Sequence, residues 1–396
     1  MAKLISAQEA ASRMGVKVET LYAYVSRGIV ESHPGPGRTR QFESRAIDVL
    51  ARRGRPRQSS RNTSLNLLIE THLTSLAADG VRYRGHPSRE LATTGPFEEV
   101  AALLWGTEPT TRPWIGEDIP LPSNVGHAAA IRIIVANLLA TGTDADGLTA
   151  NDVARAGRHL IASVVDSLPI ISASPIATLH LLDGTRIRRS IAGRLWGKLS
   201  TQLPTKQLVL TLNAALVLLA DHELAASTLG VRVAASARAN PYAIVSTGLG
   251  VLSGALHGGA SRPSRALMED ALNRGAVTAV SSLLNAGQLA PGFGHKVYVG
   301  IDPRAAVLFD LLRSTPSASH VMAVADDVCA EVRQRVEREP NVDFALAVFT
   351  HVAGMTPDAA EAIMAISRMS GWLAHAIEEY LEPPLRFRPR ALYLGP

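Results

Sequence analysis

The chain has 396 residues and is 46% hydrophobic but only 5% aromatic, so a large core must be built mainly from Ala, Leu, Val and Ile. Its single cysteine, Cys329, excludes an internal disulfide framework and a cysteine-based zinc cluster, and fits the reducing cytoplasm, where we expect the protein to act. The net charge of +5 belongs to the first 58 residues, where 11 Lys and Arg stand against 5 Asp and Glu (net +6), which leaves about −1 for the rest.

The first predicted element is a helix that begins after Ser6. Ser6 and Glu9 form a capping-box pattern, and Glu9 and Arg13 make a signal peptide implausible. The apolar face of this helix has three residues: Ala10, Ala11 and Met14. Gly15 is the expected turn residue before a second helix.

The second predicted helix follows Gly15 and stops at Gly28. Four apolar residues stand on it at helical spacing: Val18, Leu21, Tyr22 and Val25. Residues 33–42 (HPGPGRTRQF) predict a tight basic loop, and residues 44–53 a third helix. The polar segment RRGRPRQSSRNT, interrupted by Pro and Gly, predicts a linker.

These elements resemble the DNA-binding domain of the MerR family, with GPGRTRQF where that family has its wing. The resemblance implies a small winged helix-turn-helix domain over residues 1–57 and a linker over 58–64. The second helix would lie in the major groove, with four residues towards bases or phosphates: Lys17, Glu19, Thr20 and Tyr24. Arg38 and Arg40 would contact the DNA backbone. The alternative is a module that serves packing, dimer support or protein contacts without binding DNA.

The rest of the chain is mostly stretches of helical periodicity separated by Gly, Pro, Asp and Asn. Alternating strand patterns are scarce, and no internal repeat occurs. The longest apolar run, around residues 208–220, is interrupted by Thr211 and Asn213 and ends at Asp221, so it is too short to span a bilayer. The sequence therefore predicts a mainly α-helical domain over residues 65–396 without membrane association.

Residues able to do chemistry stand in separate segments of this helical part. They are His222 in DHE, His257 in LHGGA, His295 and Arg304 in GFGHKVYVGIDPR, Asp343 in NVDF, Arg368 in ISRMSGW and Arg388 in RFRPRALY. The histidines lack the HxxxH or HxH spacing of metal ligands, and no GxSxG motif of a serine hydrolase occurs. His257 and His295 lie in glycine-flanked turns, where the backbone can approach a ligand closely.

One carboxylate, neutral imidazole donors and several arginines fit a particular reaction. They suit the enolisation of a thioester and its attack on a dianionic keto acid, because arginines bind carboxylates in a bidentate manner. Each residue alone also has an ordinary structural explanation. Asp343, for example, follows Asn341 at a position where it can simply cap a helix.

The ordered motifs resemble those of the citrate synthase family. DHE, LHGGA, GFGHxVYxxxDPRA, NVDF and SRxxGW…RPRxxY occur in that family's order, and DGVRYRGHPSRELATTGPFEEVAALLWGTEP resembles its N-terminal part. The resemblance covers residues 65–396. It implies a two-domain helical fold with a small domain at about 260–362, a homodimer, and closure of the small domain over substrate. The implied reaction joins acetyl-CoA or propionyl-CoA to oxaloacetate, giving citrate or 2-methylcitrate and CoA, without a metal or other cofactor.

The resemblance also implies residue roles. Asp343 removes a proton from the acyl group, His257 stabilises the enol, and His295 polarises the keto carbonyl and protonates the alkoxide. The remaining residues bind oxaloacetate: His222, Arg304, Arg368 and, from the partner subunit, Arg388.

Some positions depart from the family pattern. Ser261 and Arg262 follow HGGA where Asn is common, Lys296 replaces a common Arg, and Val299 stands where a basic residue meets a CoA phosphate. We expect weaker CoA binding, with Arg262 or Lys296 as a substitute cation. These departures also keep a second hypothesis open, a DNA-binding regulator whose synthase-like domain senses an acyl-CoA or a keto acid.

Overall fold

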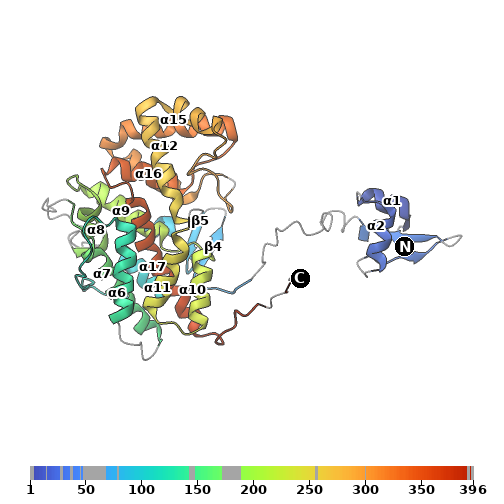
Figure 1. Ribbon diagram of the computed structural model, residues 1–396, viewed down its shortest axis with the longest axis horizontal. Helices are drawn as coiled ribbons and strands as arrows, with labels where there is room; N and C mark the ends of the chain where they lie inside the picture. Colours follow the sequence, from blue (N-terminus) through green and yellow to red (C-terminus); the bar gives the residue numbers. More distant parts are fainter. Residues whose placement is uncertain are drawn as a thin grey trace. The chain divides into compact units, whose positions relative to one another are not determined.

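The computed structural model (Figure 1) describes residues 4–14, 16–26, 30–35, 39–44, 46–47, 68–77, 80–141, 148–171, 189–254, 257–298, 300–389 and 393. The chain divides into two compact units between Glu70 and Thr71, and each is described by itself. Some predicted features lie outside the described residues: Gly15, Gly28, Arg38, Val299, the linker 58–64 and most of the helix at 44–53.

The first unit combines two short helices with a small antiparallel sheet. Its elements are β1 (Leu4–Ser6), α1 (Ala7–Arg13), α2 (Val18–Ser26), β2 (His33–Pro34) and β3 (Arg40–Glu43), with strand order β1-β3-β2. Ser6 caps α1 as predicted, because its hydroxyl accepts a hydrogen bond from the Glu9 N–H at 3.2 Å. The Glu9 carboxylate pairs with Arg13 at 2.6 Å, so it is drawn towards the next turn of the helix.

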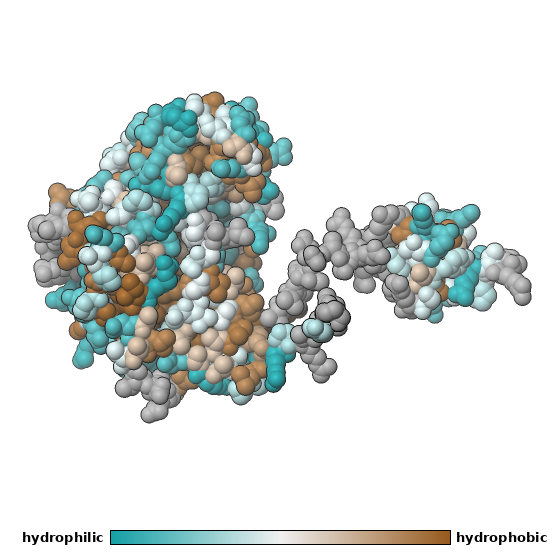
Figure 2. Space-filling view, in the orientation of Figure 1, coloured by the Kyte–Doolittle hydropathy of each residue, from teal (hydrophilic) through white to brown (hydrophobic). Residues whose placement is uncertain are grey.

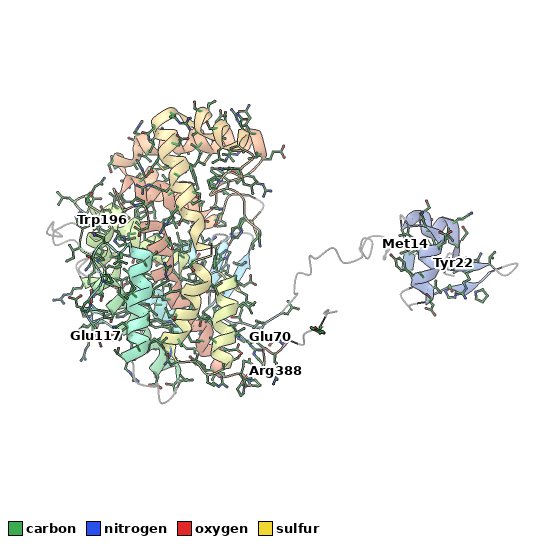
Figure 3. All side chains as sticks on the ribbon, viewed as in Figure 1. Met14, Tyr22, Glu70, Glu117, Trp196 and Arg388 are labelled. Atoms are coloured by element: carbon green, nitrogen blue, oxygen red, sulfur yellow. The ribbon has the colours of Figure 1, made fainter. Side chains whose placement is uncertain are left out.

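Helix α2 turns most of its predicted apolar face to the core, with Val18 and Val25 partly buried there, but its two tyrosines differ from the prediction. Leu21 and Tyr24 are buried in the core of this unit, Tyr24 being 7% exposed, whereas Tyr22 (labelled in Figure 3) is 41% exposed. Positions 21 and 24 share one helix face, and position 22 lies about 100° away from position 21. The prediction that Tyr24 faces DNA is therefore wrong. Lys17 and Glu19 are exposed.

The predicted basic loop at 33–42 contains a β-hairpin. Strands β2 and β3 pair antiparallel, with His33 opposite Gln41 and Pro34 opposite Arg40. The Gly35 N–H donates to the Thr39 carbonyl at 2.8 Å, which closes the ladder next to residues 36–38, outside the described part.

The second unit consists of helices and, in its described part, a three-stranded antiparallel sheet of order β4-β5-β6. The strands are β4 (Thr74–Ala77), β5 (Gly80–Tyr83) and β6 (His86–Pro87). The helices are α4 (Ser88–Thr94), α5 (Phe97–Trp105), α6 (His127–Thr141), α7 (Ala150–Ser167), α8 (Ile191–Leu199), α9 (Lys206–Leu219), α10 (Ala226–Ser236), α11 (Pro241–Leu252), η3 (Gly258–Ala260), α12 (Ser261–Arg274), α13 (Ala276–Asn285), α14 (Pro303–Arg313), η4 (Pro316–Ala318), α15 (Ser319–Val336), α16 (Val342–Val352) and α17 (Ala359–Tyr380). The mainly helical prediction is confirmed. The sheet was missed because strands of two to four residues are too short to show alternation.

Helix α17 is the centre of this unit. It packs against α5, α6, α7, α9, α10, α11 and α16, so residues on all its sides are buried. Small residues let these neighbours approach: the Gly371 N–H donates to the Ala220 carbonyl at 3.1 Å, and the Gly248 backbone lies against the Trp372 ring. The close crossing at Gly371 holds the end of α9 against α17, and the segment that follows carries His222.

Helices α12, α15 and α16 gather at one end of the unit, at the top of Figure 1, and α6, α10 and α11 lie at the other. The predicted small domain, 260–362, contains the first group, and its boundary stays a prediction. Among the described residues, no helix is both long and apolar enough to cross a membrane.

Candidate active site

One cavity of about 560 Å³ brings together six of the seven predicted site residues. These are His222, His257, His295, Arg304, Asp343 and Arg368. They come from the loop between α9 and α10, the start of η3, the segment before α14, α14 itself, α16 and α17. Arg388 is the exception, since it is exposed on the segment beyond α17, at the lower end of the unit (Figure 3).

His295 is held as a neutral ring by its own loop. Its Nδ1 accepts hydrogen bonds from the backbone N–H groups of Val297 at 3.0 Å and Tyr298 at 3.4 Å. Backbone N–H groups can only donate, so the ring proton must sit on Nε2. Burial, and then the positive charge of Arg304, lower the pKa of His295. The ring therefore offers an Nε2–H donor at neutral pH.

His222 lies edge-on to His295, with ring centroids 5.3 Å apart. Its Nε2 is 3.1 Å from the Tyr298 hydroxyl, and the Tyr298 ring stacks on His295 at 4.7 Å. Burial lowers the pKa of His222 strongly, and the charges of Arg304 and Arg368 lower it further. His222 is thus a second neutral imidazole beside the first.

His257 is oriented from behind by Ser227 in α10. Its Nε2 is 2.9 Å from the Ser227 hydroxyl, which also accepts the indole N–H of Trp372 at 3.3 Å. Because the indole only donates, the serine keeps its own proton for donation to Nε2, and in that arrangement the ring proton of His257 is on Nδ1. Burial lowers the pKa of His257, so the ring is neutral at physiological pH.

Arg304 is fixed in place by Asp302, the N-cap of α14. The Asp302 carboxylate accepts from Arg304 Nε at 3.0 Å and from Nη2 at 2.7 Å, and both side chains are buried. Asp302 also accepts from the Val342 N–H at 3.2 Å, beside Asp343. The bidentate pair therefore ties Arg304 to the start of α16.

Arg368 is buried with unused hydrogen-bonding capacity. It is 3% exposed, and in the described part of the chain its Nε and Nη1 have no hydrogen-bond partner. Burial lowers its pKa, yet a guanidinium stays charged at neutral pH. Buried donors without acceptors are costly, so this arginine is suited to an anionic ligand that enters the cavity.

Asp343 presents the opposite chemistry in the same cavity. Its Oδ1 is buried and has no hydrogen-bond partner among the described residues. Burial raises its pKa to about 6, although the charge of Arg304 acts in the other direction. Asn341 caps α16 by accepting from the Asp343 N–H at 2.9 Å, so the capping role is filled by Asn341. The carboxylate of Asp343 is left available as a base.

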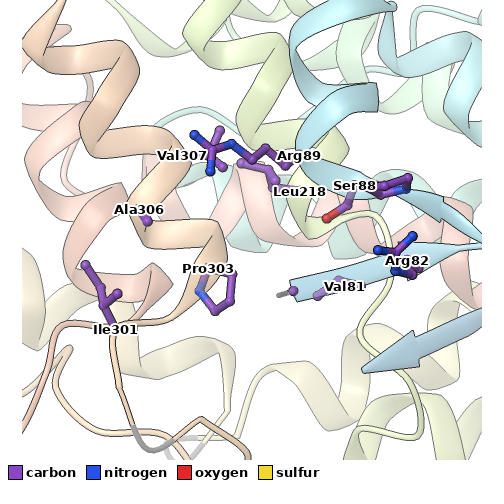
Figure 4. Close-up of a pocket in the computed structure, with 11 residues that line it drawn as sticks. Val81, Arg82, Ser88, Arg89, Leu218, Ile301, Pro303, Ala306 and Val307 are labelled. Carbon is purple, nitrogen blue, oxygen red and sulfur yellow. The ribbon is translucent and has the colours of Figure 1, made fainter. Parts of the chain in front are cut away.

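A second cavity, of about 240 Å³, lies between β5 and α4 on one side and α14 on the other (Figure 4). Arg82, Ser88 and Arg89 line one wall, and Pro303 and Val307 lie on the other. It contains none of the predicted site residues, so it is not the candidate active site. Within the described residues, no group of three or more His, Cys, Asp or Glu side chains could hold a metal ion.

The sequence analysis missed several residues that shape the site: Ser227, Tyr298, Asp302 and Asp221. Asp302 and Asp221 stand inside the motifs DPR and DHE, so their position next to functional residues was a usable signal. Ser227 offered none, because its contact with His257 depends on how α10 packs beside η3.

Comparison with known proteins finds the same family throughout. Residues 65–390 match the family described as citrate synthase, C-terminal domain. The chain is 30% identical over 349 residues to citrate synthase 2 of Bacillus subtilis, covering 82% of this chain and 92% of the relative. It is 28% identical over 356 residues to 2-methylcitrate synthase of Shewanella oneidensis, covering 82% and 92%. A solved ternary complex of citrate synthase from Thermoplasma acidophilum with carboxymethyl coenzyme A and oxaloacetate is 25% identical, with a TM-score of 0.67 and coverage of 84% and 94%.

Proposed function

The chain belongs to the citrate synthase family and is a citrate synthase-type enzyme, and we propose that its cavity joins the acyl group of an acyl-CoA to oxaloacetate. The product is citrate from acetyl-CoA or 2-methylcitrate from propionyl-CoA. The names of the relatives support both donors. The observation that carries the proposal is that one cavity holds buried polar groups without partners in the described part of the chain: donors on Arg368 and an acceptor on Asp343. Three neutral imidazoles line the same cavity.

Oxaloacetate binds through the cationic side of the cavity. Arg368 receives one carboxylate on its guanidinium, where Nε is an unused donor. Arg304, whose Nε and Nη2 are held by Asp302, contributes its positive charge and Nη1. His222 adds a neutral hydrogen-bonding group beside His295. A small dianion can therefore contact both arginines. The nearest protein carboxylate, Asp221, is 4.0 Å from Arg368 and does not occupy its donors.

Enolisation of the acyl-CoA uses Asp343 and His257. The Asp343 carboxylate removes a proton from the carbon next to the thioester carbonyl, and its pKa of about 6 makes it a stronger base than an ordinary aspartate. The Nδ1–H of His257 donates to the thioester oxygen as negative charge develops there. The two residues together make a neutral or nearly neutral enol.

Bond formation then involves His295. The enol carbon attacks the keto carbon of oxaloacetate, and the keto oxygen, polarised by the Nε2–H of His295, takes that proton as it becomes a hydroxyl. Water hydrolyses the resulting thioester and releases CoA. The proton that Asp343 took up then replaces, through water, the one that His295 gave, so both residues regain their starting protonation states.

Binding of CoA is where this chain departs from the family. Arg262 is paired with Glu361 at 3.2 Å, so it is less suited to a phosphate than Lys296, which is exposed and lines the cavity. Arg338 is exposed and lies against Gly294, next to His295. Val299 stands where the family has a basic residue for a CoA phosphate. We propose that Lys296 and Arg338 supply the positive charge instead.

The homodimer and the role of Arg388 remain part of this proposal. Arg388 is outside the cavity of its own subunit, which is compatible with delivery to a partner's site. Hydrophobic and pale residues predominate in Figure 2 over the lower part of the unit, where α6, α10 and α11 lie. Ile133 on α6 and Val233 on α10 are 37% and 44% exposed. These helices are our proposed dimer face.

The test is a steady-state panel of acyl-CoAs of increasing length with oxaloacetate, following free thiol release. We expect release with acetyl-CoA or propionyl-CoA and none with the Asp343→Ala variant. Absence of release with every acyl-CoA, from folded protein that elutes as a dimer, would overturn the proposal.

A second function, DNA binding by the first unit, rests on its charge and its hairpin. Residues 1–58 carry a net charge of +6 (11 − 5), and Arg40 is exposed on β3 beside the hairpin tip. If the chain binds DNA, retention of a palindromic fragment must fall steeply with salt and be lost in an Arg38→Ala plus Arg40→Ala variant. No retention of any genomic fragment at physiological salt excludes this function.

A further inference from the structure

Behind the cavity, Asp221 lies fully buried between Arg368 and His375. One carboxylate oxygen, Oδ2, has three donors: Thr74 Oγ1 at 2.6 Å, the Glu223 N–H at 3.1 Å and His375 Nε2 at 3.3 Å. The other oxygen, Oδ1, is 4.0 Å from Arg368 Nη1, and neither atom has a hydrogen-bond partner in the described part of the chain. The donors on Oδ2 therefore fix the carboxylate so that Oδ1 is the oxygen nearest to Arg368.

The hydrogen bond from Arg232 determines which ring nitrogen of His375 carries the proton. Arg232 Nε donates to His375 Nδ1 at 3.4 Å, and an arginine can only donate. Nδ1 is thus an acceptor, and the ring proton is on Nε2, the atom that faces Asp221. His375 is fully buried, so solvent water cannot replace the hydrogen-bond partners of its ring nitrogens.

Arg232 is held in turn by two neighbouring carboxylates of α17. Its Nη2 meets Glu378 at 2.6 Å, and its Nη1 lies 3.5 Å from Glu379. Glu378 also accepts from the Thr71 hydroxyl at 2.8 Å and the His72 N–H at 2.7 Å. Glu379 is bidentate to Arg386, on the segment that carries Arg388. A continuous set of contacts therefore connects the N-terminal and C-terminal segments of this unit with Asp221.

We propose that Asp221 and His375 are positioning residues that set the place of the Arg368 guanidinium for a keto-acid carboxylate. The donors on Oδ2 orient Asp221, and its charge holds Arg368 by attraction across 4.0 Å without using the donors that the substrate needs. A direct hydrogen bond to Asp221 would occupy one of those donors, whereas no charge at all would leave a buried guanidinium free to turn away. The inference rests on the proposed function for the identity of the ligand.

Two substitutions of His375 distinguish its hydrogen bond to Asp221 from its packing. In His375→Gln the side-chain amide can occupy the place of Nε2 and still donate to Asp221, whereas in His375→Asn the side chain is too short to do so. We expect about a tenfold rise in KM for oxaloacetate in His375→Asn with kcat changed less than about threefold, and near-normal values in His375→Gln. The matched control is His320→Asn, on the exposed surface of α15.

A second variant keeps the test valid if His375→Asn folds poorly. Thr74→Val is nearly isosteric and removes one donor to Asp221 Oδ2, so it should raise the same KM by about threefold. Calorimetric titration with oxaloacetate alone should show weaker binding in both variants, independently of any acyl-CoA.

The outcomes distinguish this inference from the proposed function. Unchanged oxaloacetate affinity in His375→Asn and Thr74→Val, in an active enzyme, overturns the positioning role and leaves the function standing. An equal KM rise in the Asn and Gln variants also overturns it, because it indicates loss of packing alone. If no CoA is released by the unaltered chain but oxaloacetate binds and the variants weaken that binding, the function fails and the positioning role stands.

Discussion

Two aspartates close to Arg304 illustrate how position decides the chemistry of one side-chain type. Asp302 is buried, which by itself raises its pKa, but the charge and the two hydrogen bonds of Arg304 bring that pKa below its usual value. Asp343 has the same neighbour without the hydrogen bonds, and burial raises its pKa to about 6. The first is a structural anion and the second is suited to accept a proton.

Replacement of each aspartate by asparagine should therefore shift stability in opposite directions. Asp343→Asn removes a charge that burial disfavours above pH 4, so we expect stability at pH 7 to rise by about 1 to 2 kcal/mol while thiol release is lost. Asp302→Asn breaks a buried ion pair and should cost on the order of 3 to 5 kcal/mol. Urea denaturation of both variants checks the signs. A large loss of stability in Asp343→Asn would contradict the view that burial of the Asp343 carboxylate destabilises the folded protein.

The rate of condensation should follow the ionisation of Asp343. The base works as a carboxylate, and its pKa of about 6 means that it is protonated below that pH. We expect kcat/KM for the acyl-CoA to fall about tenfold per pH unit below pH 6 and to level off above it. Measuring the profile in the unaltered enzyme between pH 5 and pH 8 tests this, and a level profile down to pH 5 would assign the base to another group.

At the scale of helices, the close crossing of α17 over the end of α9 requires a residue without a side chain, Gly371. A Cβ at Gly371 would lie 2.3 Å from the Ala220 carbonyl oxygen and 2.6 Å from Asp221 Oδ1. Gly371→Ala should therefore destabilise the protein by about 3 kcal/mol or more and disturb Asp221. Gly250, on the exposed side of α11, has no atom within 4 Å of its would-be Cβ. Within one subunit this position has room for a methyl group, so Gly250→Ala should not lower the stability of the separate subunit, as measured by thermal or urea denaturation; its effect on the dimer depends on the proposed dimer face, to which α11 belongs.

A buried histidine joins the starts of α6 and α17 to the end of α8. His127 Nδ1 is 2.9 Å from Asp358 Oδ1, and Nε2 is 2.8 Å from the Lys198 carbonyl oxygen. An acceptor at each ring nitrogen favours the imidazolium. Burial by itself lowers the pKa of His127, but the hydrogen bonds and charge of Asp358 and the Lys198 carbonyl raise it above its usual value.

The sign of the resulting pH dependence follows from linkage. A folded-state pKa raised above the unfolded value stabilises the protein fully below about pH 6.5, and this stabilisation is lost as pH rises through the folded-state pKa. His222, His257 and His295, with lowered pKa values, act in the opposite sense. We therefore expect His127→Gln to lose more stability at pH 6 than at pH 9 relative to the unaltered chain. An equal loss at both pH values would show that His127 is neutral in the fold.

For the whole molecule, the proposed sharing of Arg388 between subunits gives a sharp test. A chain with Asp343→Asn and a chain with Arg388→Ala should each be inactive as homodimers. In a mixed dimer, one site has its own Asp343 and receives Arg388 from the partner, so random mixing should restore about a quarter of the activity. Mixing after denaturation and refolding, followed by the thiol assay, measures this. No recovery from demonstrably mixed dimers would place Arg388 outside the site.

Much of the site could be predicted from the sequence, because its residues stand in motifs that the family shares. Six of the seven predicted residues line one cavity, and the order of the motifs indicated the helical fold. Which tyrosine of α2 is buried could not be predicted from the apolar residues, because Tyr22 and Tyr24 each stand three or four positions from another apolar residue of the helix. Which tyrosine is buried depends on how α2 packs against α1 and the rest of this core.

The sequence alone determined the helical class and the cap at Ser6, and it predicted the residue types proposed for the catalytic chemistry, since these depend on neighbours within a few positions. Only the tertiary structure decided the rest. The proton positions on His295 and His375, the raised pKa of Asp343 and the unused donors of Arg368 depend on burial and on which distant group lies at hydrogen-bond distance. Those quantities arise when α9, α10, α16 and α17 pack together, and no local pattern encodes them.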